Sequence, residues 1–353
     1  MLKISVITPS LNSGKYIERA IQSVLEQSYA NFEHIVVDGL SSDNTVEILK
    51  RYPHIKWISE KDNGQSRAMN KGFAMATGDV IVYLNTDDYF YPEVFSTVVP
   101  HIEAGAKMVI GKLKVISNGG ATRILDPSSQ YMDILKHWKV LFPINPVQYF
   151  YVRSLQEGKS FNEANHLSMD HEFLLHLYRQ TTPVKIDRLF GVFDMVDGSK
   201  TAEGIKNPID YWAPENFAYL DSYLEELTPK EIVALKNEQC SYFLTRHKRH
   251  AIIGLNQLKA DMEGFESIVI YGAGTQFEAI HELFSGKITC VIDSNPDVQG
   301  AFIHGYEIST PEVLNTIKAS AILVTPFGYR KEILSTLAPA AGTKVIFLED
   351  YFR

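Results

Sequence analysis

Residues 78 to 88 of the chain read Gly78-Asp79-Val80-Ile81-Val82-Tyr83-Leu84-Asn85-Thr86-Asp87-Asp88. The apolar run from Val80 to Leu84 predicts a buried strand, because β-branched and aromatic side chains suit a pleated surface that is covered on both faces. Asp87 and Asp88 then stand at the carboxyl end of that strand. Since ligands of open parallel sheets bind just outside the carboxyl ends of the strands, these two carboxylates are the first candidates for a binding site.

The segments on either side of this strand alternate between predicted strands and helices. Earlier strands are predicted at Lys3–Thr8, Phe32–Val37 and Ile55–Ser59. Helices are predicted over residues 15–27 and 67–76, with a further helix after residue 44. Later strands near residues 107–113, 146–152 and 190–196 continue the sheet and close the domain. Such alternation is typical of right-handed βαβ units, so we expect an α/β fold built on a parallel sheet.

The predicted strands of this region end in acidic residues. Asp38 follows the second strand, Asp62 lies just past the third, and Asp87 and Asp88 follow the fourth. These acids could be binding residues or simple helix caps, and both interpretations stay open. Asp38 alone, or Asp87 and Asp88 before the helix that starts near Pro92, can cap a helix. Several carboxylates on one rim of a sheet would repel each other, and a divalent cation that bridges them to a diphosphate removes this conflict. Oxygen ligands indicate Mg²⁺ or Mn²⁺.

Composition narrows the class of protein. The chain has 353 residues, 45% of them hydrophobic and 22% charged, which is ordinary for a globular protein of two domains. A net charge of −8 argues against nucleic acid as a partner. Cys240 and Cys290 form no disulfide framework, and Met1-Leu2-Lys3 leads directly into a predicted strand without a signal peptide. We therefore expect a cytoplasmic protein, soluble or peripherally attached to the inner face of the membrane.

Four motifs carry a resemblance to family 2 glycosyltransferases of the GT-A fold over about residues 1 to 200. They are Ile4–Asn12, Val36–Gly39, Ser42–Thr45 and Asn85–Asp88. The resemblance implies a mixed sheet with helices on both faces. It also implies a metal-dependent transfer of a sugar, with inversion, from a nucleotide-sugar to a hydroxyl acceptor, with UDP favoured as the nucleotide. The acceptor would be a glycan or a lipid-linked molecule in polysaccharide, lipopolysaccharide or other glycoconjugate synthesis.

The resemblance also assigns expected roles to residues. The residues at its nucleotide-binding positions are Thr8, Pro9, Ser10, Asp38 and Asp62. Asp87 and Asp88 match the acidic motif that binds the metal, Mn²⁺ or Mg²⁺, and the ribose. Arg67 and Lys200 are expected phosphate contacts, and Lys200 lies in a Ser-Lys-Thr segment found in similar transferases. Asn85 departs from the pattern, because many members have aspartate there and an amide oxygen is a weaker, neutral ligand.

The helix that starts in Leu167-Ser168-Met169-Asp170-His171-Glu172 carries the expected general base. Asp170 could be a simple first-turn acid that the helix dipole stabilises. The family, however, has its general base at such a helix start, and inverting transfer needs one carboxylate to take the proton of the acceptor hydroxyl. We expect Asp170 in that role, with Glu172 in reserve and His171 at the surface or in the wall of the pocket.

Residues 202–264 are predicted to be a helical connector between two domains, 1–201 and 265–353. Thr228 and Glu231 show the spacing of a capping box. The segment Thr245–Lys259 combines basic and apolar residues. It is compatible with peripheral contact to an anionic membrane and also with a solvated helix that braces the two domains.

The C-terminal segment restarts the strand–helix alternation and predicts a second, smaller Rossmann-like α/β domain. Gly272 and Gly274 follow its first strand and lead into a helix, and Asp293 ends its second strand. These three residues predict a nucleotide site, although Phe277 occupies the place of the third glycine of the dinucleotide fingerprint. Two alternatives to a glycosyltransferase therefore stay open. They are an NAD-linked sugar-nucleotide dehydrogenase or epimerase that uses this domain, and a non-catalytic sugar-nucleotide-binding protein.

Overall fold

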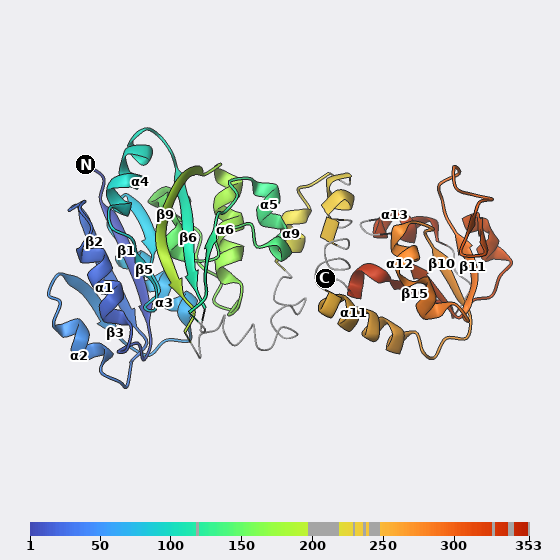
Figure 1. Cartoon of the computed structure of the whole chain (residues 1–353), viewed down its shortest axis with the longest axis horizontal. Helices are drawn as coiled ribbons and strands as arrows, with labels where there is room; N and C mark the ends of the chain where they lie inside the picture. Colours follow the sequence, from blue (N-terminus) through green and yellow to red (C-terminus); the bar gives the residue numbers. More distant parts are fainter. Residues whose placement is uncertain are drawn as a thin grey trace. The chain divides into compact units, whose positions relative to one another are not determined.

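The structure is a computed structural model that describes residues 1–117, 120–196, 219–228, 230–235, 238–239, 248–326, 329–337 and 342–351. The chain divides into two compact units, Met1–Leu220 and Asp221–Arg353. Each unit has its own sheet (Figure 1). The α/β expectation, with a mixed sheet first and a second sheet in the C-terminal part, is confirmed.

The sheet of the N-terminal unit contains the motifs of the predicted site. Its strands are β1 (Ile4–Ser10), β2 (Phe32–Asp38), β3 (Ile55–Ser59), β4 (Val80–Tyr83), β5 (Tyr89–Phe90), β6 (Met108–Ile116), β7 (Thr122–Leu125), β8 (Tyr149–Val152) and β9 (Val184–Asp194). They are ordered β3-β2-β1-β4-β8-β6-β9-β5, and β7 pairs with β6. The first four strands are parallel, β8 is antiparallel to both β4 and β6, and β9 is parallel to β6. The two reversals cancel, so β9 runs in the same direction as β4.

Helices cover both faces of this sheet, as Figure 1 shows. They are α1 (Ile17–Leu25), α2 (Thr45–Lys50), α3 (Gln65–Met75), α4 (Val94–Glu103), α5 (Tyr131–Leu135) and α6 (Met169–Gln180), with short 3₁₀ turns η1 (His137–Lys139), η2 (Pro146–Gln148) and η3 (Arg153–Leu155). Successive side chains of a strand point to opposite faces. Val6 of β1 accordingly packs in the core with Val24 of α1 and Phe95 of α4. On the other face, a Cβ at Gly72 of α3 would lie 2.3 Å from Ile7 Cγ2, so glycine lets this helix approach the sheet closely.

A buried acid at the other end of these strands has a structural role. The Glu33 side chain of β2 accepts hydrogen bonds from the Ser5 hydroxyl at 2.6 Å and the Thr77 backbone N–H at 2.7 Å. Lys56 Nζ donates to its second oxygen at 2.6 Å, and Lys3 Nζ lies 3.0 Å from the same oxygen. Burial by itself would raise the pKa of Glu33, but these hydrogen bonds outweigh burial and lower it. Glu33 thereby ties together β1, β2, β3 and the turn before β4.

The C-terminal unit is a smaller α/β arrangement. Its strands are β10 (Ile268–Tyr271), β11 (Ile288–Ile292), β12 (Phe302–Ile303), β13 (Tyr306–Ser309), β14 (Ala321–Val324) and β15 (Lys344–Phe347), in the order β12-β13-β11-β10-β14-β15. All pairs except β12–β13 are parallel. Its helices and turns are α11 (Lys248–Asp261), α12 (Thr275–Phe284), α13 (Arg330–Thr336), η5 (Pro311–Asn315) and η6 (Leu348–Tyr351).

The predicted connector is described only in part. A short helix, α9 (Leu220–Leu224), is followed by the expected capping box, because the Thr228 hydroxyl donates to Glu231 at 2.7 Å and accepts from the Glu231 N–H at 3.3 Å. The basic helix α11 packs on η6, where the Tyr351 hydroxyl donates to Asp261 at 2.8 Å. Within the described ranges, the helices are too short or too polar to cross a bilayer.

Candidate functional site

The carboxyl ends of four parallel strands meet at one edge of the N-terminal sheet. The strand register pairs Ser10 of β1 with Asp38 of β2, and Asp38 with Ser59 of β3. Leu84, which follows β4, donates its backbone N–H to the carbonyl oxygen of Ile7 at 2.9 Å. The structure therefore brings Ser10, Asp38 and the acidic loop after β4 to the same edge, as the strand-end pattern predicted.

Asp38 and Asp62 lie next to each other at this edge. The Asp38 carboxylate is fully buried and accepts hydrogen bonds from the Ser41 N–H at 2.9 Å and the Ser59 hydroxyl at 2.6 Å. A Cβ at Gly39 would lie 3.2 Å from Asp62 Oδ1, so the absence of a side chain lets the half-buried Asp62 carboxylate rest against the backbone. The two acids therefore differ, because Asp38 stabilises the edge and Asp62 is the more accessible of the two.

The end of β1 contributes one unsatisfied polar group. Ser10 Oγ is buried, and no described residue forms a hydrogen bond with it. Thr8 is different, because its hydroxyl is fully buried and bonded to His34 Nε2 at 2.9 Å. Pro9 is buried as well. Among these three residues, only Ser10 has a side-chain polar group that lacks a hydrogen-bond partner among the described residues.

Asp88 is the most tightly held acid of the site. Its side chain is fully buried, and Oδ2 accepts from Asn145 Nδ2 at 2.7 Å and from Asn85 Nδ2 at 3.0 Å. Oδ1 accepts the longer bond from the Asp194 N–H at 3.3 Å. Burial, followed by the negative charge of Asp87, raises the pKa of Asp88 well above its usual range. A cation beside Asp88 would stabilise the charged form of this buried carboxylate.

Asp87 and Asp194 share one arginine of α1. Arg19 Nη2 donates to the Asp87 carbonyl oxygen at 2.6 Å and lies 2.8 Å from Asp194 Oδ2. Its guanidinium also stacks over the Tyr89 ring, 4.5 Å from the ring centroid. Burial raises the pKa of Asp87, and the charge of Asp194 raises it further. Arg19 therefore holds the backbone of the acidic loop against the end of β9.

The chemistry of these residues fits a divalent cation in part. Asp87 and Asp88 supply two carboxylates, and oxygen ligands suit Mg²⁺ or Mn²⁺. In the part of the chain that the structure describes, no group of three or more His, Cys, Asp or Glu side chains is arranged to hold a metal ion. The protein would therefore share the ion with other oxygen ligands, such as those of a diphosphate.

The sequence analysis missed Asn145, Arg19 and Asp194. Asp194 is an acid at the carboxyl end of a parallel strand, and the reasoning that identified Asp38 would have found it. The predicted strand ran to residue 196, whereas β9 ends at Asp194. Asn145 precedes Pro146 at the start of a 3₁₀ turn, which identifies a cap but does not indicate contact with Asp88.

The expected general base, Asp170, lies on α6. Asp170 is half-buried in its first turn, and Oδ1 accepts the His171 N–H at 2.8 Å. The neighbouring Tyr149 of β8 has a pKa well above its usual range, because of burial and then the negative charge of Asp170. Glu172 Oε2 accepts from Asn162 Nδ2 at 3.2 Å and from Asn165 Nδ2 at 2.9 Å. These contacts tie Glu172 to the loop before α6.

The expectation that His171 lies at the surface was wrong. Its ring is buried, with Nε2 2.8 Å from the carbonyl oxygen of Ile134 and Nδ1 2.6 Å from the Tyr219 hydroxyl. Burial lowers its pKa to about 4. The reason is helix geometry, because a residue one position from Asp170 faces about 100° away from it and points toward α5. His171 therefore joins α6 to its neighbours.

The family comparison identifies the domain that carries this edge. Residues 5–159 match the family model described as Glycosyl transferase family 2. This part of the chain belongs to that family. The family expected from the four motifs is thereby confirmed, and Asp170 lies just beyond the matched residues.

Curated relatives extend the match at lower identity. An uncharacterized glycosyltransferase of Nostoc sp. is 31% identical over 179 residues, which cover 42% of this chain and 56% of that protein. The poly(ribitol-phosphate) beta-N-acetylglucosaminyltransferase TarS of Staphylococcus aureus is 22% identical over 261 residues, which cover 70% of this chain and 44% of TarS. The chain spans about half the length of these curated relatives.

A solved structure supports the fold of the family 2 domain. A crystal structure of S. aureus TarS 1–349 in complex with UDP-GlcNAc matches with a TM-score of 0.57 at 18% identity, covering 81% of this chain and 82% of that chain. At this identity the likeness shows the fold alone. The expected GT-A fold is therefore confirmed.

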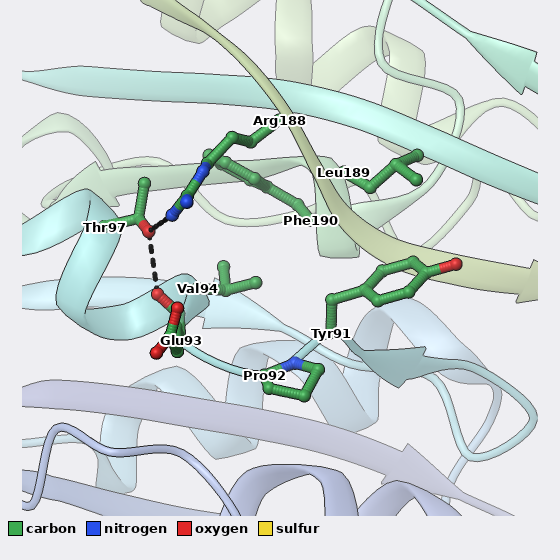
Figure 2. Close-up of a pocket in the computed structure, with 8 residues that line it drawn as sticks. All are labelled: Tyr91, Pro92, Glu93, Val94, Thr97, Arg188, Leu189 and Phe190. Atoms are coloured by element: carbon green, nitrogen blue, oxygen red, sulfur yellow. Dashed lines mark hydrogen bonds between the residues drawn. The ribbon is translucent and has the colours of Figure 1, made fainter.

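A pocket of about 200 Å³ lies beside β5 and the neighbouring part of β9 (Figure 2). Its lining residues are Tyr91, Pro92, Glu93, Val94, Thr97, Arg188, Leu189 and Phe190. Arg188 Nη1 donates to Thr97 Oγ1 at 3.0 Å, and that hydroxyl donates to the Glu93 carbonyl oxygen at 2.8 Å. None of the predicted site residues of the family 2 domain lines this pocket, so it is separate from the acidic edge.

The remaining predicted site residues are Arg67, Lys200 and three residues of the C-terminal unit. Arg67 is exposed in the first turn of α3, and Lys200 lies outside the described residues. In the C-terminal unit, Gly272 has a φ of +102° and Gly274 precedes α12. Asp293 Oδ2 accepts the Ala273 N–H at 2.9 Å, and Oδ1 accepts the Asn295 N–H at 2.8 Å. The structure brings Gly272, Gly274 and Asp293 together, with both Asp293 oxygens engaged by backbone donors.

Proposed function

We propose that this chain is an inverting, divalent-cation-dependent glycosyltransferase. It would move a sugar from a nucleoside-diphosphate sugar, with UDP as the nucleotide, to a hydroxyl group of a glycan or lipid-linked acceptor. The observation that carries the proposal is the meeting of Asp38, Asp62 and Asp88 at one edge of a family 2 domain. The similarity to the N-acetylglucosaminyltransferase TarS, whose crystal structure contains UDP-GlcNAc, supports the choice of UDP.

The nucleotide would lie along the ends of β1 and β2. Asp62 and the Ser10 hydroxyl are suited to bind the ribose and the base, because Asp62 is accessible and Ser10 Oγ has no partner among the described residues. Asp38 would act by keeping this edge in place through Ser41 and Ser59. Arg67 and Lys200 would contact the phosphates, and Thr8 and Pro9 would shape the backbone beneath the nucleotide.

Asp88 and Asp87 would hold the cation together with the diphosphate. When bound there, Mn²⁺ or Mg²⁺ would stabilise the charge that develops on the departing nucleoside diphosphate. The protein contributes two carboxylates whose charged forms are destabilised by burial and by nearby negative charge. A positive partner would remove this destabilisation. Arg19 would hold the acidic loop against the end of β9.

Asp170 would act as the general base. The acceptor oxygen would attack the anomeric carbon from the side opposite the diphosphate while its proton passes to the Asp170 carboxylate. A new C–O bond forms, the bond between the anomeric carbon and the phosphate oxygen breaks, and its electron pair leaves with the nucleoside diphosphate. One displacement of this kind inverts the anomeric centre.

The test is a nucleotide screen on the full chain. We expect UDP and UDP-sugars to raise the Tm in the presence of Mn²⁺ and slow release of UDP from a matching UDP-sugar. Asp88→Ala should remove the Mn²⁺-dependent part of both effects. Binding without either transfer or hydrolysis of the donor would favour a sugar-nucleotide-binding protein instead, and an Asp88→Ala variant as active as the wild type would refute the assigned role of the acid.

We propose no second activity for the C-terminal unit. An NAD-type site would use the Asp293 carboxylate for ribose, whereas both oxygens accept backbone N–H groups here. Phe277, which takes the place of the third glycine, is fully buried in the unit. These contacts give the dehydrogenase or epimerase alternative no support.

A further inference from the structure

Two amide side chains hold the same oxygen of Asp88. Asn145 Nδ2 lies 2.7 Å from Asp88 Oδ2, and Asn85 Nδ2 lies 3.0 Å from it. Asn145 comes from the loop before η2, 57 positions away in the sequence, and Asn85 comes from the same turn as Asp88. Both amides present a donor nitrogen to Asp88, which is not how a metal ligand would be oriented, so their position needs an explanation of its own.

The orientation of the Asn145 amide is set by a second contact. Its Oδ1 accepts the Val147 N–H at 3.0 Å, which makes Asn145 the N-cap of η2. Because the oxygen serves the cap, the NH₂ group is left to face Asp88. The loop itself is anchored by Gln148, which accepts the Ile144 N–H at 2.9 Å and donates to the Gly111 carbonyl of β6 at 3.3 Å.

The Asn85 amide is oriented in the same way from the other side. Its Oδ1 accepts from Gln65 Nε2 at 3.0 Å, so its NH₂ group also faces Asp88. The Asn85 oxygen is therefore already engaged, which differs from the expectation that it would be a weak ligand of the ion. An aspartate at this position would place a further carboxylate against Asp88 Oδ2 instead of a donor.

We propose that Asn145 and Asn85 are positioning residues that fix the Asp88 carboxylate through Oδ2 and leave Oδ1 open to a further ligand. Among the described residues, Oδ1 receives only the longer bond from the Asp194 N–H at 3.3 Å. Two donors on one oxygen prevent the carboxylate from turning about its side chain, so the acid is already oriented before a cation binds. The inference rests on the proposed function, because it assigns the amides a role toward the proposed ion.

Two variants of Asn145 separate the cap from the contact with Asp88. Asn145→Ser keeps a good cap for the Val147 N–H but is too short to reach Asp88. Asn145→Asp also keeps a cap oxygen, but it replaces the donor with a carboxylate oxygen that faces Asp88. The control is Asn31→Ala, which removes an amide that donates to the Leu2 carbonyl at 3.1 Å, at the opposite end of β1.

The experiment measures binding of Mn²⁺ to the full chain by electron paramagnetic resonance, with and without UDP, beside UDP binding in the absence of metal and the Tm of each variant. We expect Asn145→Ser and Asn145→Asp to weaken Mn²⁺ binding by about 10- to 100-fold, the usual cost of losing a group that orients a metal ligand. Metal-free UDP binding should stay as in the wild type. Asn31→Ala should change at most the Tm.

The outcomes distinguish this inference from the proposed function. If the wild type binds Mn²⁺ with UDP and Asn145→Ser binds it equally well, Asn145 is only a cap and the inference is wrong. If Asn145→Asp fails to fold, Asn145→Ser still decides, because it introduces no charge. If the wild type binds no Mn²⁺ in the presence of UDP, the proposed function itself fails, and the inference falls with it.

Discussion

The Ser66 hydroxyl donates a hydrogen bond to the Met169 sulfur at 2.6 Å, so the first turn of α3 touches the first turn of α6. Gln65, which begins α3, also reaches Asn85 in the acidic loop. Asp170 follows Met169 directly. The first turn of α3 therefore contacts both the loop that carries Asp87 and Asp88 and the residue that precedes Asp170.

Asp170→Asn should separate chemistry from donor binding. We expect transfer to fall by about 10²- to 10⁴-fold, the usual contribution of a general base, because the amide cannot accept the proton. Binding of UDP with Mn²⁺ should stay near the wild-type level. Initial rates with a UDP-sugar, together with calorimetry on UDP, check both parts.

Glu172→Gln is the matched control for this change. Because Glu172 accepts two asparagine amides, the variant should lower the Tm by loosening the loop before α6 while most of the transfer activity remains. If Glu172→Gln abolished transfer in a folded protein and Asp170→Asn did not, the two roles would have to be exchanged.

Arg19→Ala should lower the catalytic efficiency with the nucleotide-sugar donor. The side chain holds the Asp87 carbonyl and the Asp194 carboxylate, so its loss should let the acidic loop shift. We expect kcat/KM for the donor to fall by about 10- to 100-fold, since small displacements of positioning groups cost this much.

Arg51→Ala tests whether this effect is specific. Arg51 forms an exposed ion pair with Glu18 at 3.1 Å. We expect kcat/KM to stay at the wild-type value, because exposed ion pairs contribute little. Equal losses in the two arginine variants would contradict the role given to Arg19.

Glu33 should make the N-terminal unit sensitive to acid. Its pKa is lowered in the folded state, so the unfolded state takes up the proton first as the pH falls below the ordinary value of 4.5. The free energy of unfolding should therefore decrease as the pH drops through this range. Glu33→Gln should cost about 1–3 kcal/mol at neutral pH and flatten this decrease.

Tryptophan fluorescence during urea denaturation measures this effect. All three tryptophans, Trp57, Trp138 and Trp212, precede Leu220, so the signal reports on the unit Met1–Leu220. The difference between wild type and Glu33→Gln cancels the other titrating groups. A difference that does not change between pH 7 and pH 4 would show that the Glu33 charge contributes nothing to stability.

Much of the N-terminal fold could be predicted because its signals are local. The apolar run that begins at Val80 forms the fully buried β4, and Asp38 ends β2. Hydrophobic period and turn residues are read within a few positions, and parallel strands then carry their end residues to one edge. The surface position expected for His171 was wrong because burial by a neighbouring helix leaves no local signal.

The α/β class, the family 2 motifs and the acids at the ends of β2 and β4 all follow from short-range patterns in the sequence. The groups that surround Asp88 depend instead on how distant parts of the chain pack. Asn145 and Asp194 lie 57 and 106 positions away from it. Asn145 reaches it because β8 is antiparallel to β4, so that the chain before β8 lies at the carboxyl end of β4, and Asp194 because two strand reversals return β9 to the direction of β4. Contacts across such separations depend on strand order and packing, since short-range sequence patterns do not encode which distant side chains will meet.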